Sequence, residues 1–147
     1  AAPELAASTE GEELVADYAS LGLTLGRHPV SLLRDGLNRH HCLPCGNLAH
    51  TGHGQRVRVA GLVINRQQPH SARGTLFITL EDESGHANLI LRPWLKPRHR
   101  RALLAGRMLQ VEGVVQRHGE VVHLLVDEVT DRTPWLGELP TRSRDFG

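Results

Sequence analysis

The feature that most constrains the fold is a pair of short alternating segments at residues 75–80 and 87–91. Apolar residues occupy every second position of the first segment, which is the period of a strand with one buried side. The acidic stretch 81–85 interrupts the pattern before it resumes. The two segments therefore predict an antiparallel hairpin whose loop is those five residues.

Three further segments alternate in the same way, at residues 56–64, 107–116 and 121–129. A helix is predicted between the hairpin and the second of these segments. Pro97 suits its first turn, where a missing N–H costs nothing, and Gly106 suits its end. The predicted order is therefore strand, hairpin, helix, hairpin.

Five strands with one helix between the third and fourth match the small barrel of the oligonucleotide/oligosaccharide-binding (OB) type. Gly61 and Gly113 fall inside strands, at points where the chain must bend to close such a barrel. An SH3-like barrel is the competing architecture, but it does not need the helix. We therefore predict a mainly β fold with α flanks, an OB-fold barrel preceded by a short helical segment.

The barrel is predicted over residues 56–130, and composition divides the flanks. We expect a mobile acidic N-terminus at 1–11, a helical segment at 12–37, a linker at 38–55 and an extended tail at 131–147. The apolar residues of the tail either bind a partner or pack back on the barrel. They are Trp135, Leu136, Leu139 and Phe146. Since the chain begins with Ala, we expect it to be cut from a longer polypeptide.

Charge is distributed unevenly, although the formal net charge is only +1. Residues 1–26 hold five acids and no Lys or Arg, whereas the remainder holds 17 basic and 11 acidic residues. A positive body favours a polyanionic partner. The sequence contains no run of 18 apolar residues, so no membrane association is expected. Two cysteines fit a reducing cytosol, so we expect a cytoplasmic protein.

A metal-like cluster lies in the predicted linker, with the spacing C-x2-C-x4-H-x2-H. Cys42, Cys45, His50 and His53 are ligand types that zinc accepts, but genuine sites usually have a longer middle spacing. Redox chemistry would need the CxxC in a strand-then-helix setting, which is missing. We therefore expect no metal here, with zinc on these four residues as the alternative.

No catalytic set is recognisable. Glu81, Asp82 and Glu83 are adjacent on a turn and are expected to point apart into solvent, so they cannot hold a pair of metal ions. The sequence has no phosphate-binding loop and no dinucleotide or nucleophile motif. A binding module is therefore predicted rather than an enzyme.

Four stretches of the sequence resemble the C-terminal region of the bacterial error-prone DNA polymerases, C-family enzymes related to the alpha subunit of DNA polymerase III. They are YASLGLTLGRHPVSLLR (18–34), VRVAGLVINRQ (57–67), FITLEDESGHANLIL (77–91) and SRDF (143–146). The resemblance runs from about residue 12 onward, and TLEDESG and GRHP are its most specific parts. It does not require Cys42 or Cys45.

The resemblance implies translesion synthesis in the SOS response to DNA damage. It implies that the catalytic aspartates and their Mg²⁺ belong to an upstream polymerase core, so that this stretch needs no cofactor. Its implied partners are that core, a Y-family-like polymerase and a small RecA-like protein. Two functions compete: an accessory module that binds single-stranded DNA, and a protein-docking module. An independent enzyme has no support beyond the shared fold.

The predicted DNA-binding face follows from how OB folds bind strands, across strands two and three and the flanking loops. If the alternating leucines of 75–80 point inward, Phe77 and Thr79 point out, although a one-residue slip would bury Phe77. The candidate contacts are, on the two strands, Phe77, Thr79, Asn88 and Arg92; in the loops, Arg66, Arg73 and Arg117; and on the helix, Lys96 and Arg98. The alternative for the helix cations is a solvated helix face, and they rank below the loop arginines as candidates.

Overall fold

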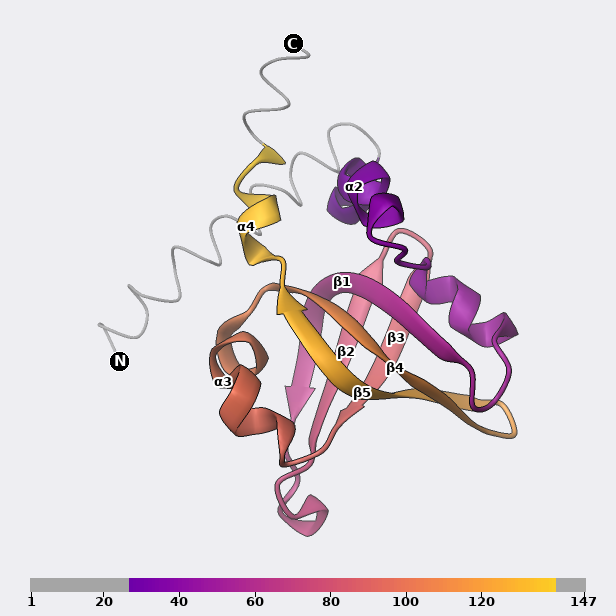
Figure 1. The fold of residues 1–147 in the computed structure, drawn as a ribbon, viewed down its shortest axis with the longest axis vertical. Coiled ribbons are helices and arrows are strands. Elements are labelled where there is room, and N and C mark those ends of the chain that lie inside the picture. Colours follow the sequence, from indigo (N-terminus) through magenta and orange to yellow (C-terminus); the bar gives the residue numbers. More distant parts are fainter. Residues whose placement is uncertain (1–26, 140–147) are drawn as a thin grey trace.

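A computed structural model describes residues 27–139 and has five strands that form a closed barrel (Figure 1). Around the barrel the order is β1-β2-β3-β5-β4, with β3 and β5 parallel and the other neighbours antiparallel. The strands are β1 (Arg56–Gln67), β2 (Leu76–Asp82), β3 (Gly85–Leu91), β4 (Met108–His118) and β5 (Val121–Asp131). The predicted five-stranded barrel is confirmed.

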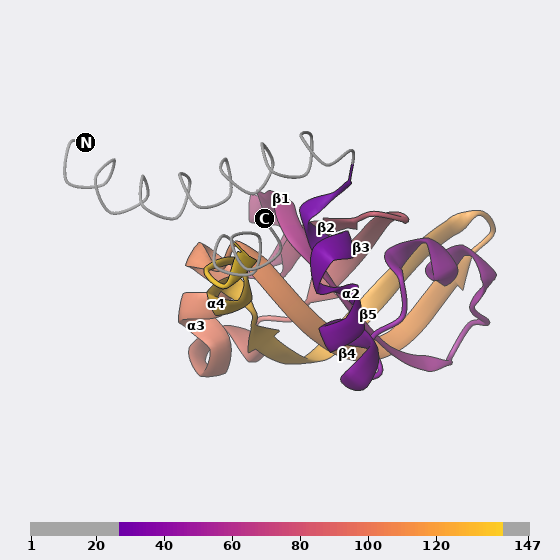
Figure 2. The same ribbon diagram turned by 90° about the horizontal axis from the view of Figure 1, so that it is seen from above.

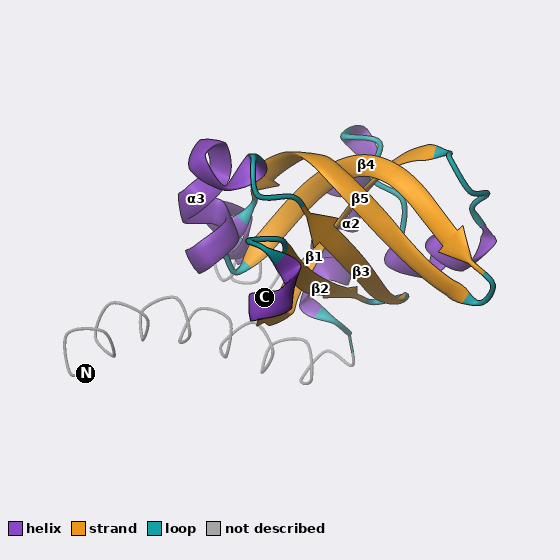
Figure 3. Cartoon of the chain, turned by 90° about the horizontal axis from the view of Figure 1, so that it is seen from below, coloured by secondary structure: helices purple, strands orange, loops and turns teal. Residues whose placement is uncertain are grey.

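Short helical elements surround the barrel, and α3 lies between β3 and β4 as predicted (Figure 3). They are η1 (Pro29–Leu33), α2 (Arg34–Arg39), η2 (Cys45–His50), η3 (His70–Ala72), α3 (Leu95–Ala105) and α4 (Thr133–Leu136). In α3, Leu95 and Leu103 are buried in the barrel core, and the helix is kinked at His99. None of the helices within residues 27–139 has the length and apolarity needed to cross a membrane.

The barrel interior is filled by the inward faces of all five strands. On β2 and β3 the buried positions are Leu76, Ile78, Leu80, Ala87, Leu89 and Leu91. These residues are the ones that the period-two pattern assigned to the inside, so the predicted register holds. Phe77 is half-buried and lies on the outer face with Thr79. The alternative slip that would bury Phe77 in the barrel is therefore excluded.

A second core covers the outer face of β1 and β4. Ala60 and Leu62 of β1, with Met108 of β4, pack against the segments that precede and follow the barrel. The flank residues in this cluster are Val30, Leu33, Leu37, Cys42, Leu136 and Leu139. The central part of β1 is therefore buried on both faces, and the folded unit extends beyond the predicted barrel.

This second core changes two predicted boundaries. Residues 38–55, expected to be a linker, carry η2, and Leu43 forms a parallel bridge with Val59 of β1. The described part of the tail, expected to be extended, forms α4 and places Leu136 and Leu139 in the second core. Both segments are short and aperiodic, so tertiary packing rather than local pattern decides their structure. The predicted N-terminal region 1–11, most of the helical segment and Phe146 lie outside the described residues.

Candidate nucleic-acid interface

The outer face of β2 and β3 carries the phenyl ring of Phe77. Phe77 pairs with Ile90 across the two strands, and Thr79 pairs with Asn88. Phe77, Thr79 and Ile90 are half-buried and Asn88 is exposed. The Thr79 hydroxyl donates to Asn88 Oδ1 over 3.4 Å, a long hydrogen bond at the surface. The structure thus brings three of the predicted contacts, Phe77, Thr79 and Asn88, onto one face.

Positive charge gathers where this face ends, at the junction of the β1–β2 loop with the start of α3. Here a side chain at Gly74 would lie 3.3 Å from Pro93, and Lys96 Nζ donates to Gln68 Oε1 over 2.9 Å. We call the following residues the basic end: Arg73, Arg92, Trp94, Lys96 and Arg98. Within residues 27–139 none of its four cations forms an ion pair.

Trp94 was missed by the sequence analysis. Trp94 is 56% exposed, whereas tryptophan is highly buried on average. The local sequence RPWLKPR carries the signal that could have identified it, because a tryptophan between prolines and cations is poorly suited to a buried amphipathic helix. The residue precedes Leu95, which is fully buried.

Arg66 was predicted in a loop but lies in β1, where its guanidinium is half-buried. Nε donates to the Leu103 carbonyl over 2.6 Å, and Nη2 donates to the Gly106 carbonyl. The side chain therefore satisfies carbonyls that the end of α3 leaves open. Burial lowers the pKa of Arg66 from its ordinary value. A phosphate contact would require this side chain to leave its carbonyls.

Arg117, also predicted in a loop, lies near the end of β4 and is similarly occupied. Its Nη2 donates to the carbonyls of Ala49 and Thr51 over 2.7 and 3.0 Å, and its backbone N–H donates to His53 Nδ1 over 2.9 Å. Figure 2 shows η2 alongside the β4–β5 hairpin that these bonds connect. Arg117 thus anchors the segment before β1 to the barrel.

The acidic hairpin turn lies at the opposite end of β2 and β3 from the basic end. The sequence predicted a solvated five-residue loop. The structure corrects this, because β2 runs through Asp82 and β3 begins at Gly85, which leaves a two-residue turn. We call Glu81, Asp82 and Glu83 the acidic end. Asp82 is only 3% exposed, and such burial of a carboxylate requires partners.

Asp82 has those partners. It accepts hydrogen bonds from the Cys45 backbone N–H at 2.7 Å, from the Ser84 hydroxyl at 2.6 Å and from Arg34 Nη2 at 3.0 Å. Burial alone would raise the pKa of Asp82, but the bonds from Ser84 and Cys45 outweigh burial, and the pKa lies below its ordinary value. Arg34 Nε also donates to Glu83 over 2.7 Å, and this bond raises the pKa of Arg34.

Glu81 completes this end of the barrel. Its two carboxylate oxygens each lie 3.0 Å from a histidine ring nitrogen, one on His28 and one on His86. These bonds lower the pKa of Glu81 below its ordinary value. His28 belongs to the upstream flank, and its Nδ1 accepts the Val30 N–H at the start of η1. The acidic end therefore holds the upstream flank in place.

The four candidate zinc ligands are not brought together. Cys42 lies in the second core and Cys45 in the barrel core, while His50 is exposed and His53 accepts a hydrogen bond from the backbone N–H of Arg117. Burial raises the pKa of Cys42 to about 11, and it raises that of Cys45 further still. Both thiols are therefore protonated at neutral pH. In the described ranges no three His, Cys, Asp or Glu side chains are placed to share a metal ion.

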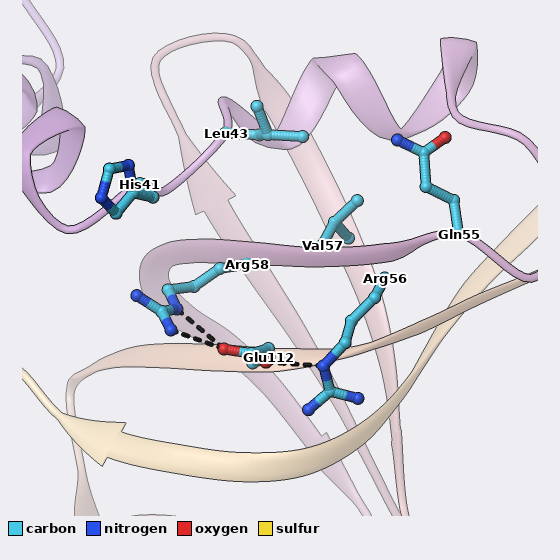
Figure 4. A pocket seen from close by; sticks show the side chains of 7 residues that line it. All are labelled: His41, Leu43, Gln55, Arg56, Val57, Arg58 and Glu112. Carbon is cyan, nitrogen blue, oxygen red and sulfur yellow. Dashed lines mark hydrogen bonds and ion pairs between the residues drawn. The ribbon is translucent and has the colours of Figure 1, made fainter.

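A hollow of about 410 Å³ lies between β1 and the segment that precedes it (Figure 4). It is lined by His41, Leu43, Gln55, Arg56, Val57, Arg58 and Glu112. Glu112 accepts from Arg56 Nε and Arg58 Nη2, both at 2.6 Å. These bonds lower the pKa of Glu112 below its ordinary value. The arginines of the hollow are thus neutralised, unlike those of the basic end.

The sequence model of the OB-fold nucleic acid binding domain matches residues 57–132, which cover the five strands except for Arg56, the first residue of β1. The chain belongs to this family. It is also 56% identical over 99% of its length to an error-prone DNA polymerase of Alkalilimnicola ehrlichii, and 53% identical over 99% to one of an Azoarcus species. This OB-fold chain spans 14% of the length of each of these relatives. The resemblance to error-prone polymerases is confirmed.

A solved structure has the same fold. Asparaginyl-tRNA synthetase from Pyrococcus horikoshii, in complex with asparaginyl-adenylate, matches 62% of this OB-fold chain with a TM-score of 0.53. The match covers 22% of the synthetase, at 19% sequence identity. At this identity the likeness supports the barrel architecture alone.

Proposed function

We propose that this OB-fold chain is an accessory module that binds single-stranded DNA for an error-prone DNA polymerase. The basic end, whose cations form no ion pair among the described residues, lies beside the β2–β3 face, and this is the observation that carries the proposal. A strand lying across Phe77 and the Thr79–Asn88 pair would place its phosphates towards Arg73 and Arg92. Stacking combined with a positively charged groove is how proteins bind single strands with little sequence preference.

The wider context is part of the same proposal. In it, the polymerase acts in translesion synthesis during the SOS response, in the cytoplasm. Its catalytic carboxylates and Mg²⁺ belong to a core outside this chain, and a Y-family-like polymerase and a RecA-like protein join it. The supporting observations are the names of the relatives and the small fraction of their length that the chain spans. The chain alone is expected to incorporate no nucleotide in a primer-extension assay.

The test is a titration of the 147-residue chain with a fluorescein-labelled oligonucleotide of about 15 thymidines, followed by anisotropy at several salt concentrations. Binding should weaken with salt, because each phosphate contact releases counterions. Phe77→Ala should weaken binding by about 1–3 kcal/mol if a base stacks on the ring. Salt-independent or undetectable binding at low salt would contradict the proposal.

Protein docking is the second candidate, and one feature of the structure favours it. The described part of the tail is folded onto the barrel beside the upstream flank, with Trp135 half-buried against His40. A folded composite surface of this kind can be recognised by a protein. If oligonucleotides fail to bind while the purified upstream polymerase core does bind, docking replaces DNA binding as the function.

A further inference from the structure

We infer that Trp94 is a base-stacking platform that extends the single-strand path beyond the β2–β3 face. This inference rests on the proposed DNA binding and adds a specific residue and contact to it. OB folds of known type are read across strands two and three and their flanking loops. Trp94 lies outside that set, at the residue immediately before α3.

The backbone holds Trp94 in a defined place. The Leu95 N–H donates to the Arg92 carbonyl over 3.0 Å, and the Lys96 N–H donates to the Pro93 carbonyl over 3.1 Å. These two bonds form a tight backbone turn that contains Trp94. Leu95 is fully buried and anchors the turn to the barrel core. An aromatic ring on a fixed backbone loses little conformational entropy when a base stacks on it.

Trp94 differs from the other described tryptophan in having no aromatic or cation–π partner among the described residues. Trp135 packs at 5.5 Å from the His40 ring, with the Arg132 guanidinium 4.5 Å above it. No ring contact or cation–π contact involves Trp94 among the described residues. The other large exposed apolar residues in this part of the chain are aliphatic: Ile64, Leu104 and Val121. Among the Trp and Phe rings of residues 27–139, Trp94 is therefore the exposed one, whereas Phe77 and Trp135 are half-buried.

The charge around Trp94 selects a polyanion. Between residues 84 and 111 the sequence contains six Arg or Lys and no Asp or Glu. Arg92 and Arg98 are exposed and Arg73 lies across the junction from Pro93, all without an ion pair inside the described region. Indole also favours a neighbouring cation, but none of these cations forms a cation–π contact with Trp94 among the described residues, so a nucleobase can stack on the ring.

Trp94 also continues the candidate path along β3. Asn88 and Ile90 are outward positions of β3, two residues or about 7 Å apart, and the strand ends at Leu91. The turn that contains Trp94 follows directly, so the indole lies just beyond this end of the face. A strand that stacks on Phe77, which pairs with Ile90, would therefore meet a cation and then a second aromatic ring. This arrangement of rings and cations suits bases and phosphates that follow one another.

Fluorescence can report on this site directly, because the chain has two tryptophans. In a Trp135→Phe variant of the 147-residue chain, all tryptophan emission comes from Trp94. Addition of the thymidine oligonucleotide should quench that emission. An oligonucleotide of equal length with abasic sites throughout carries the same phosphates and should leave it unchanged. Labelled-oligonucleotide anisotropy on the chain with Trp135 intact gives the affinities independently of that substitution.

The decisive comparison is between Trp94→Ala and Leu104→Ala. The second substitution removes an exposed apolar side chain from α3, the helix that Trp94 precedes. Trp94→Ala should weaken thymidine binding about 5- to 150-fold and change abasic binding less than about twofold. Leu104→Ala should change neither. Both variants should melt with the parent, since both side chains are exposed.

Three outcomes overturn the inference. Equal loss on both oligonucleotides would mean that Trp94 only supports the phosphate contacts. Unchanged thymidine binding in Trp94→Ala would leave the indole as a protein-contact residue. If the parent chain binds neither oligonucleotide at low salt, the proposed DNA binding fails together with the inference. The first two outcomes overturn the inference but not the proposed DNA binding.

Discussion

The two ends of the β2–β3 hairpin carry opposite charges and use them differently. At the acidic end every carboxylate is bonded: Glu81 to two histidines, Asp82 to Arg34 and to backbone N–H groups, and Glu83 to Arg34. At the basic end the cations have no ion pair among the described residues. Charge at the first end is used to hold the fold together, and charge at the second remains available for a ligand.

The difference has an energetic consequence. A buried carboxylate without partners costs several kcal/mol. Removing its partners, or the carboxylate on which they depend, should therefore lower the free energy of unfolding. An exposed arginine without an ion pair contributes little to the free energy of unfolding. Its removal should change only the affinity for a polyanion. Substitutions at the two ends should therefore separate stability from binding, and the predictions below test that separation.

The largest effect is expected from Asp82→Ala. Its side chain is inaccessible to solvent, and its loss leaves the Cys45 N–H without its acceptor and breaks the buried ion pair with Arg34. We expect the free energy of unfolding to fall by about 3–5 kcal/mol. Urea unfolding followed by circular dichroism measures it. Glu120→Ala, at an exposed carboxylate of the β4–β5 turn, should change it by less than about 0.5 kcal/mol. Equal effects would remove the structural role of the acidic end.

A second comparison sets Arg117 against Arg73. Arg117→Ala would leave the Ala49 and Thr51 carbonyls without their donor, so we expect a loss of about 1–3 kcal/mol in unfolding free energy. Arg73→Ala should be neutral for stability, because the exposed Arg73 side chain forms no hydrogen bond or ion pair among the described residues. Sequence analysis treated both as loop arginines that bind phosphate. If both substitutions destabilise equally, exposure in this structure does not separate structural from ligand-binding arginines.

Acid titration should reveal the acidic end without any substitution. The pKa values of Glu81, Asp82 and Glu83 are all lowered in the folded chain. Their contribution to stability is therefore complete above their ordinary pKa, about 4 to 4.5, and is lost as the pH falls through the lowered values. The urea midpoint should be lower at about pH 3.5 than at about pH 6. In Asp82→Asn this difference should shrink, and an unchanged difference would contradict the assignment.

The sequence was sufficient for the barrel, because its physical determinants are local. Alternation identified the inward faces of β2 and β3. Pro97 lies in the first turn of α3 and Gly106 directly follows its last residue, as the sequence predicts. Gly61 was expected at a bend. In the structure a side chain there would lie 2.7 Å from the Glu81 carbonyl, so the glycine permits the close approach of β1 to β2.

The sequence was not sufficient for the site, because side-chain partners come from distant residues. Nothing in the local pattern indicates that Asp82 bonds to Arg34, 48 residues away, or that Arg66 bonds to the end of α3. Three acids on a turn predict solvent exposure, and an arginine beside a loop predicts a free cation. Tertiary contacts reverse both expectations. Arg73, Arg92 and Arg98 kept their expected exposure because no acid in the described residues reaches them.

The smallest effect on folding, and the sharpest test of the basic end, is expected from Arg92→Ala. We expect the unfolding free energy to change by less than about 0.5 kcal/mol, because the side chain is exposed and unpaired. The slope of log affinity against log salt for the thymidine oligonucleotide should become shallower by about 0.7, the value for one lost phosphate contact.

Arg56→Ala supplies the matched control for this measurement. Arg56 is exposed, as Arg92 is, but its guanidinium is bonded to Glu112 and Asp127. Its removal should leave the salt slope unchanged, since a neutralised cation releases no counterion from DNA. Arg92→Lys should keep the slope because it keeps the charge. If Arg92→Ala and Arg56→Ala change the slope equally, pairing within the fold does not decide which arginines meet DNA, and the contrast between the two ends fails at the basic end.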